Sequence, residues 1–272
     1  MPFFTHENIE FHYRSGGTGL PFFFQHGLGA ELGQPFSLFQ PPPGFRLLAF
    51  DVRAHGLTNP IGDPAKLRFN TFAEDLRALM NYLEIQKAIV GGISMGAGLA
   101  LNFTLRFPER VLGLVLSRPA WLDAPNPWNV KMFSLVTRLI REHGAQRGQE
   151  VFRQTAEYAE LLQKWPDVAN SLALQFESPR VEETAFKLES IIQDTPNTDR
   201  QQWKSIRVPT LVLANRQDPI HPFEYGEILA AAIPGAELKE ITSKSVSIER
   251  HEADVQRYIG EFLTNNFRKT TS

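Results

Sequence analysis

The sequence predicts an α/β fold with a mostly parallel central sheet, flanking helices and an inserted helical region. Short apolar runs rich in branched and aromatic residues alternate with segments of helical periodicity. Several runs are almost continuously apolar, as strands of a parallel sheet buried on both faces are. The alternation breaks between residues 119 and 203. We therefore expect a core formed by residues 1–118 and 204–272, with a helical cap inserted at 119–203.

The expected strands are IEFHY, PFFFQ, RLLAF, KAIVGG, VLGLVL, VPTLVLA and AELKEI. The expected core helices span residues 71–83, 95–107, 223–233 and 252–263. The first of them is predicted to open on a capping box between Thr71 and Glu74. In an open sheet of this kind, an active site is expected beyond the carboxyl ends of the strands.

Composition limits the classes of function. A net charge of −2 without a block of basic residues argues against nucleic-acid and membrane partners and favours a small molecule. The absence of cysteine excludes disulfides, thiolate metal sites and a cysteine nucleophile, and no clustered ligand spacing indicates a metal. The start of the chain has no signal-peptide pattern, and no apolar run approaches about 18 residues. We expect a cytoplasmic enzyme that uses no cofactor.

The segment IVGGISMGAG, residues 89–98, places Ser94 between a predicted strand and a predicted helix. A serine at such a turn needs small residues two positions before and after it, and Gly92 and Gly96 hold those positions. The turn projects the hydroxyl above the sheet and aims the helix N-terminus at developing negative charge. Glycine-rich turns also serve packing or phosphate binding, but both nucleotide-binding glycine patterns are missing. Ser94 is our predicted nucleophile.

A nucleophilic serine requires two preorganised donors for the oxyanion. The backbone amide of Met95 is one candidate. The other is expected in the loop after an early strand, FFFQHGLGA, where we choose the amide of Leu28. The same loop is also explained as a tight turn held by a buried His26, and the two interpretations are compatible because the donor is backbone.

With these pieces in order, the chain resembles the α/β-hydrolase superfamily, in particular its cap-bearing serine hydrolases, over nearly its whole length. The segments that carry the resemblance are QHGLGA, DVRAHG, GGISMGAG and VLANRQDPIHP. DVRAHG departs slightly, because Ala54 stands where the family often has glycine. The resemblance implies a nucleophile, acid and histidine in that chain order, and a structural role for His55.

Asp218 stands at the position of the catalytic acid, after the predicted strand TLVLA. An aspartate there orients a histidine and stabilises its imidazolium. The alternative is a residue that only shapes an Asp-Pro turn. Asp123, which follows the preceding strand, is the reserve acid.

The base is the least regular part of the pattern. In the family a histidine follows the last strand in a Gly-His setting, whereas this chain continues as ITSKSVSIERHEADV. The usual histidine position aligns with residues 245–247, none of which acts as a base. His251 is our candidate, brought to Ser94 by a rearranged loop; the alternative is a surface residue at a helix start and a triad without its base. His221 is too close to Asp218 along the chain to be preferred and is expected to pack beneath the acid loop.

Arg118 directly follows the predicted strand VLGLVLS and is expected near the pocket floor. There its guanidinium would favour an acyl group that carries a carboxylate, unless it only forms an ion pair between cap and core. Trp121 and other aromatic residues of the predicted cap are candidates for an apolar inner face, although at helical spacing such residues more often form core.

The sequence thus predicts a serine hydrolase for a small carboxylic ester or lactone, in which Ser94 attacks, His251 transfers the proton and Asp218 orients it. A carbon–carbon bond hydrolase or an acyltransferase with the same residues is the enzymatic alternative. A ligand-binding, receptor-like protein with an impaired triad is the alternative from another class. The expected partner is a small ester-like molecule, and the sequence leaves open whether the chain forms a homodimer.

Overall fold

The computed structural model describes residues 2–268, and its strands form one eight-stranded sheet in the order β1-β2-β4-β3-β5-β6-β7-β8. β1 (Phe3–His6) pairs antiparallel with β2 (Ile9–Gly17), which pairs antiparallel with β4 (Gly44–Phe50). The other neighbouring strands are parallel to one another: β3 (Gly19–Gln25), β5 (Ala88–Ile93), β6 (Val111–Ser117), β7 (Thr210–Ala214) and β8 (Glu237–Glu240). The predicted, mostly parallel sheet is confirmed; β1, too short and too exposed to show a pattern, was not predicted.

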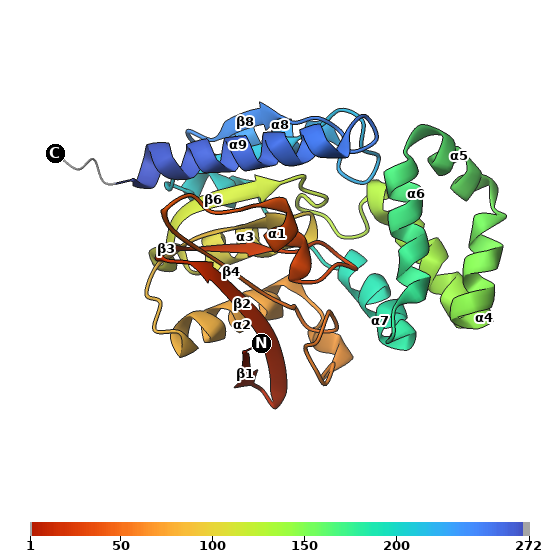
Figure 1. Cartoon of the computed structure of the whole chain (residues 1–272). Helices are drawn as coiled ribbons and strands as arrows, with labels where there is room; N and C mark the ends of the chain where they lie inside the picture. The colour runs from red at the N-terminus through yellow and green to blue at the C-terminus, as the bar shows by residue number, and fades with distance from the viewer. Residues whose placement is uncertain (1, 269–272) are drawn as a thin grey trace.

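Helices cover both faces of this sheet (Figure 1). The side chains of β3 show how: Phe22 and Phe24 enter one apolar cluster and Phe23 enters the other. The first cluster is closed by α9 (Ile248–Phe267) and α1 (Gly33–Leu38), and the second by α2 (Phe69–Tyr82), α3 (Met95–Arg106) and α8 (Phe223–Ala232). Because both faces are buried, the parallel strands are apolar almost without interruption.

Four further helices lie together beside the sheet, at the right of Figure 1. They are α4 (Lys131–Arg153), α5 (Ala156–Lys164), α6 (Pro166–Ala173) and α7 (Val181–Ile192). All fall within residues 119–203, between β6 and β7, and we call this stretch the helical segment.

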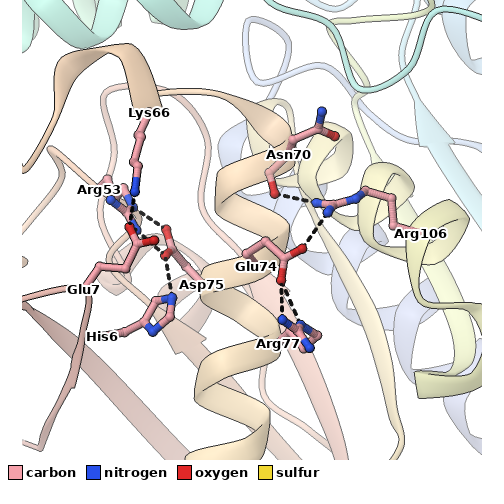
Figure 2. Close-up of polar contacts among 9 residues, drawn as sticks. All are labelled: His6, Glu7, Arg53, Lys66, Asn70, Glu74, Asp75, Arg77 and Arg106. Carbon is pink, nitrogen blue, oxygen red and sulfur yellow. Dashed lines mark hydrogen bonds and ion pairs between the residues drawn. The ribbon is translucent and has the colours of Figure 1, made fainter.

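The start of α2 differs from the prediction. The helix begins at Phe69 rather than at Thr71, and the expected capping box does not form. Instead, the carboxylate of Asp194, from the helical segment, accepts a hydrogen bond of 2.7 Å from the Phe69 N–H. Glu74 turns outward and forms ion pairs with Arg106 and Arg77 (Figure 2). The helix end is therefore satisfied by a residue distant in sequence.

The last helix begins four residues earlier than predicted, at Ile248, because the hydroxyl of Ser247 accepts a hydrogen bond from the Arg250 N–H. This start places His251 in the first turn of α9. Among residues 2–268, no helix is both long enough and apolar enough to cross a membrane.

Candidate active site

Ser94 lies at the turn between β5 and α3 with a φ of 57°, in a region that residues other than glycine rarely adopt. Its N–H donates to the carbonyl of Ser117 at 2.9 Å. A Cβ atom added to Gly92 would lie 2.3 Å from the carbonyl carbon of Gly96, and one added to Gly96 would lie 2.4 Å from the carbonyl oxygen of Gln25. The two glycines are therefore required by the close passage of three backbone segments at this turn.

A cavity of about 260 Å³ lies above Ser94, between the sheet and the helical segment. The core contributes Leu28, Ser94, Arg118, Asp218, His221 and Lys244. The helical segment contributes Phe133, Asp167, Val168, Ser171 and Leu172. The cavity lies beyond the carboxyl ends of β3, β5, β6, β7 and β8, where a binding site is expected in an open α/β sheet.

The predicted oxyanion donors lie beside this turn. Leu28 lines the cavity, and Met95 is the first residue of α3. An added Cβ on Gly27 would lie 3.4 Å from the Cβ of Ser94, so the Leu28 loop packs directly on the serine. The N–H groups of Leu28 and Met95 donate to no other described residue. Neither amide is therefore used within the part of the chain that the structure describes.

Two histidines hold the Leu28 loop. His26 accepts a hydrogen bond from the Val52 N–H on Nε2, so its Nδ1–H donates to the carbonyl of Gly27. His55 likewise accepts from the Gly29 N–H on Nε2 and donates from Nδ1. Burial lowers the pKa of both rings, most strongly that of His55, and keeps them neutral. Both rings therefore hold the Leu28 loop in place through hydrogen bonds to backbone.

An ion-pair cluster around Arg53, which precedes His55 by two positions, anchors this part of the backbone; Figure 2 shows the cluster. Arg53, almost completely buried, donates two hydrogen bonds of 2.7 Å to the carboxylate of Asp75 in α2. Glu7 accepts from both Arg53 and Lys66, and these cations lower its pKa to about 2. The cluster lies outside the cavity and ties the backbone at Arg53 to Glu7 and to α2.

The side chain of Asp218, in the loop after β7, is almost completely buried and accepts four hydrogen bonds. Its Oδ1 accepts from the N–H groups of Ile220 and His221 at 3.1 Å, and its Oδ2 lies 2.8 Å from His221 Nδ1 and 3.3 Å from an Arg118 nitrogen. Burial alone would raise the pKa of Asp218, but His221 and Arg118 outweigh it and hold the pKa well below its usual value. The carboxylate is thus ionised and directed at a histidine.

That histidine is His221, which the sequence analysis set aside. The expectation that it packs beneath the acid loop was wrong, because its ring lines the cavity together with Ser94. Its Nδ1–H donates to Asp218, which leaves Nε2 as the acceptor nitrogen. Burial lowers the pKa of His221, and the opposing effect of Asp218 does not restore it. The imidazole is therefore neutral at pH 7, as a proton acceptor must be.

His251, the candidate base, forms no hydrogen bond with Ser94 or Asp218. Its ring, in the first turn of α9, is completely buried and does not line the cavity. Nδ1 lies 2.8 Å from the carbonyl of Thr242, so it donates there, and Nε2 is buried without a partner among the described residues. Burial lowers its pKa to about 4. Neither the rearranged loop nor the surface position considered above describes it.

The other candidates divide between the cavity and the core. Arg118 lines the cavity and pairs with Asp218 rather than linking the core to the helical segment. Trp121, expected near the substrate, lies in the apolar core at 5.5 Å from the ring of Phe69 and does not line the cavity. The reserve acid Asp123 accepts from Arg200 and is also outside it. Within residues 2–268, no cluster of three or more histidine or carboxylate side chains is arranged to hold a metal ion.

The comparisons with known proteins agree with this fold. A family model for the alpha/beta hydrolase fold matches residues 21–244. The chain is 25% identical over 242 residues to the AB hydrolase superfamily protein YisY of Bacillus subtilis, covering 86% of this chain and 87% of the relative. It is 24% identical to 3-oxoadipate enol-lactonase 2 of Acinetobacter baylyi, covering 85% and 84%.

Among solved structures, the enol-lactonase of Burkholderia xenovorans superposes with a TM-score of 0.73 at 25% identity, covering 97% of this chain and 100% of that one. The relatives named for their activity are hydrolases, which supports a hydrolase on this fold. The chain belongs to the α/β-hydrolase fold family.

Proposed function

We propose that this protein is a serine hydrolase that cleaves a small carboxylic ester or lactone through an acyl-enzyme on Ser94. The observation that carries the proposal is the meeting of three groups at one cavity: a serine on a strained turn, two unpaired backbone amides beside it, and a neutral histidine bonded to a buried carboxylate. Together they form the constellation required for acyl transfer.

In the proposed reaction, the proton of the Ser94 hydroxyl passes to His221 Nε2 while the oxygen attacks the carbonyl carbon. The Leu28 and Met95 amides stabilise the oxyanion, and removal of one such donor typically costs about 2.7–4 kcal/mol. His221 then returns the proton to the leaving oxygen, and an acyl-enzyme forms. Water activated by the same imidazole releases the acid and restores Ser94.

Ser94 Oγ forms no hydrogen bond to another described residue, and in the proposed reaction its contact with His221 forms when the substrate binds. Catalytic hydrogen bonds are often long without substrate and tighten when it binds. The helical segment, as the proposed cap, supplies the apolar wall of the cavity through Phe133, Val168 and Leu172. A cavity of about 260 Å³ suits a small substrate better than a long lipid chain.

The names of the relatives favour esters and lactones. They include enol-lactonases and a bifunctional esterase/perhydrolase. A relative named as a hydrolase of 2-hydroxy-6-oxo-6-phenylhexa-2,4-dienoate keeps carbon–carbon cleavage as the alternative reaction at the same site. Product analysis separates the two reactions, since only the ester or lactone reaction leaves the carbon skeleton intact.

The proposal is tested by labelling with a fluorophosphonate, which phosphonylates only an activated serine. Intact mass is compared for the parent, Ser94→Ala and Ser171→Ala, the last being a matched control because Ser171 lines the same cavity on α6. We expect one label on the parent and on Ser171→Ala, and none on Ser94→Ala. Equal labelling of all three proteins, or no labelling of the parent, contradicts an activated Ser94.

A further inference from the structure

Lys244 is an unpaired cation at the cavity. It lies four residues after the end of β8 and lines the same cavity as Ser94. Its ammonium forms no hydrogen bond or ion pair with another described residue. The other charged groups lining the cavity have partners: Arg118 and Asp218 pair with each other, and Asp167 accepts a hydrogen bond from the Ser245 hydroxyl.

The backbone that carries Lys244 is held on both sides. Before it, the Ser243 hydroxyl donates to the Gln217 carbonyl at 2.8 Å, and Thr242 donates two hydrogen bonds to Asp254. After it, Ser245 is bonded to the helical segment through its hydroxyl. The lysine is thus presented from a fixed loop, which lowers the entropic cost of using it for binding.

The surroundings of Lys244 make its charge costly without a ligand. Burial lowers the pKa of Lys244, and the nearby Arg118 lowers it further, against the weaker opposing effects of Asp167, Glu252 and Asp218. A partly desolvated ammonium gains most from an anion that binds directly to it. Arg118, which the sequence suggested for this role, pairs with Asp218 through one nitrogen at 3.3 Å, and its buried Nε has no partner among the described residues.

We propose that Lys244 binds a carboxylate carried by the substrate, so that the enzyme selects anionic esters or lactones over neutral ones. The inference rests on the proposed hydrolase function and names its substrate class. The apolar residues Phe133, Val168, Leu172 and Ile248, which also line the cavity, would contact the carbon chain between the carboxylate and the reacting carbonyl. Lys244 is then a specificity residue that does not take part in proton transfer.

The test compares two esters of matched length: the 4-nitrophenyl monoester of adipic acid, which carries a free carboxylate, and the same compound methylated on that carboxylate. The parent is expected to favour the anionic ester. In Lys244→Met we expect kcat/KM for the anionic ester to fall about 10- to 100-fold, mainly through KM, as the loss of a charge-assisted hydrogen bond implies. For the methylated ester, kcat/KM of Lys244→Met should stay within about threefold of the parent value.

Controls distinguish a failure of this inference from a failure of the proposed hydrolase function. Lys239→Met removes a half-buried lysine of β8 outside the cavity and should change kcat/KM for neither ester. Lys244→Arg should retain the preference for the anion. In the inactive Ser94→Ala background, monomethyl adipate should raise Tm, dimethyl adipate should not, and Lys244→Met should abolish the difference.

An equal loss on both esters would assign Lys244 to the chemical step and overturn the inference. So would a parent without preference for the anionic ester. Hydrolysis of the methylated ester that persists in Ser94→Ala would instead refute the proposed function, whatever the selectivity.

Discussion

His221 Nδ1 lies 2.8 Å from Asp218 Oδ2, although the two residues are only three positions apart in one loop. The turn is closed by two N–H groups that donate to the other oxygen of Asp218, and this closure brings the imidazole over the carboxylate. The acid and the histidine beside the cavity therefore come from a single loop. His251, from the last helix, is bonded elsewhere.

Asp218→Asn should retain the fold and lose most activity. The amide still accepts hydrogen bonds from the loop, but it no longer stabilises the imidazolium or fixes the tautomer that leaves Nε2 as the acceptor. The corresponding change in a serine protease triad lowers kcat by about 10⁴, and we expect a loss of about 10³–10⁴. Turnover of 4-nitrophenyl butyrate measures it, with Asp123→Asn as the control outside the cavity. Similar rates in both variants would contradict the role of Asp218.

The pH dependence of kcat/KM should show an acid limb with its midpoint below 6.5. Burial lowers the pKa of His221, and the reaction requires the unprotonated ring, so activity rises with pH through that pKa and is level near pH 7. For the anionic ester, kcat/KM should also fall as pH rises and Lys244 loses its proton. The midpoint of this fall should lie below 10.5, because burial lowers the pKa of Lys244. A midpoint above 6.5 on the acid side would contradict the assignment of His221.

Gly96→Ala should destabilise the fold. The new Cβ would lie 2.4 Å from the carbonyl oxygen of Gln25 and 2.8 Å from that of His26, and these backbone atoms cannot rotate away as a side chain can. Overpacking of this kind typically costs about 1–3 kcal/mol, which urea unfolding detects. Gly260→Ala is the matched control in α9, because nothing lies within 4 Å of its new Cβ. It should leave stability unchanged or raise it by about 0.5–1 kcal/mol.

His251 should contribute to acid sensitivity of the fold. Its pKa is 6.5 when unfolded and about 4 in the buried site, so between these values the unfolded chain binds the proton first. Stability is present above pH 6.5 and falls as pH decreases toward 4, by up to about 3 kcal/mol from this residue. The free energy of unfolding, measured by urea at several pH values, should fall more steeply with decreasing pH in the parent than in His251→Phe across this window. Parallel curves would contradict a buried neutral ring.

Much of the fold was readable from sequence because its signals are local. The strands are apolar without interruption, and the turn at Ser94 and the loop at Leu28 carry their glycines within a few residues. The start of α2 was missed because its first N–H is satisfied by Asp194, 125 residues away in the chain. No local pattern identifies such a partner.

The position of the base was not readable for a different reason. Sequence proximity suggested that His221 was unavailable to Asp218, whereas the turn after Asp218 folds the chain back on itself. The sequence signal for this turn is the Pro-x-His spacing directly after the aspartate. The burial of His251 depends on the early start of α9, which was set by the Ser247 cap.

The most direct test compares His221→Ala with His251→Phe in steady-state hydrolysis of 4-nitrophenyl butyrate, with Ser94→Ala as the blank. If His221 accepts the proton from Ser94, His221→Ala loses about 10³-fold or more in kcat, while His251→Phe stays within about tenfold of the parent. The reverse pattern, an active His221→Ala and an inactive but folded His251→Phe, would contradict the account.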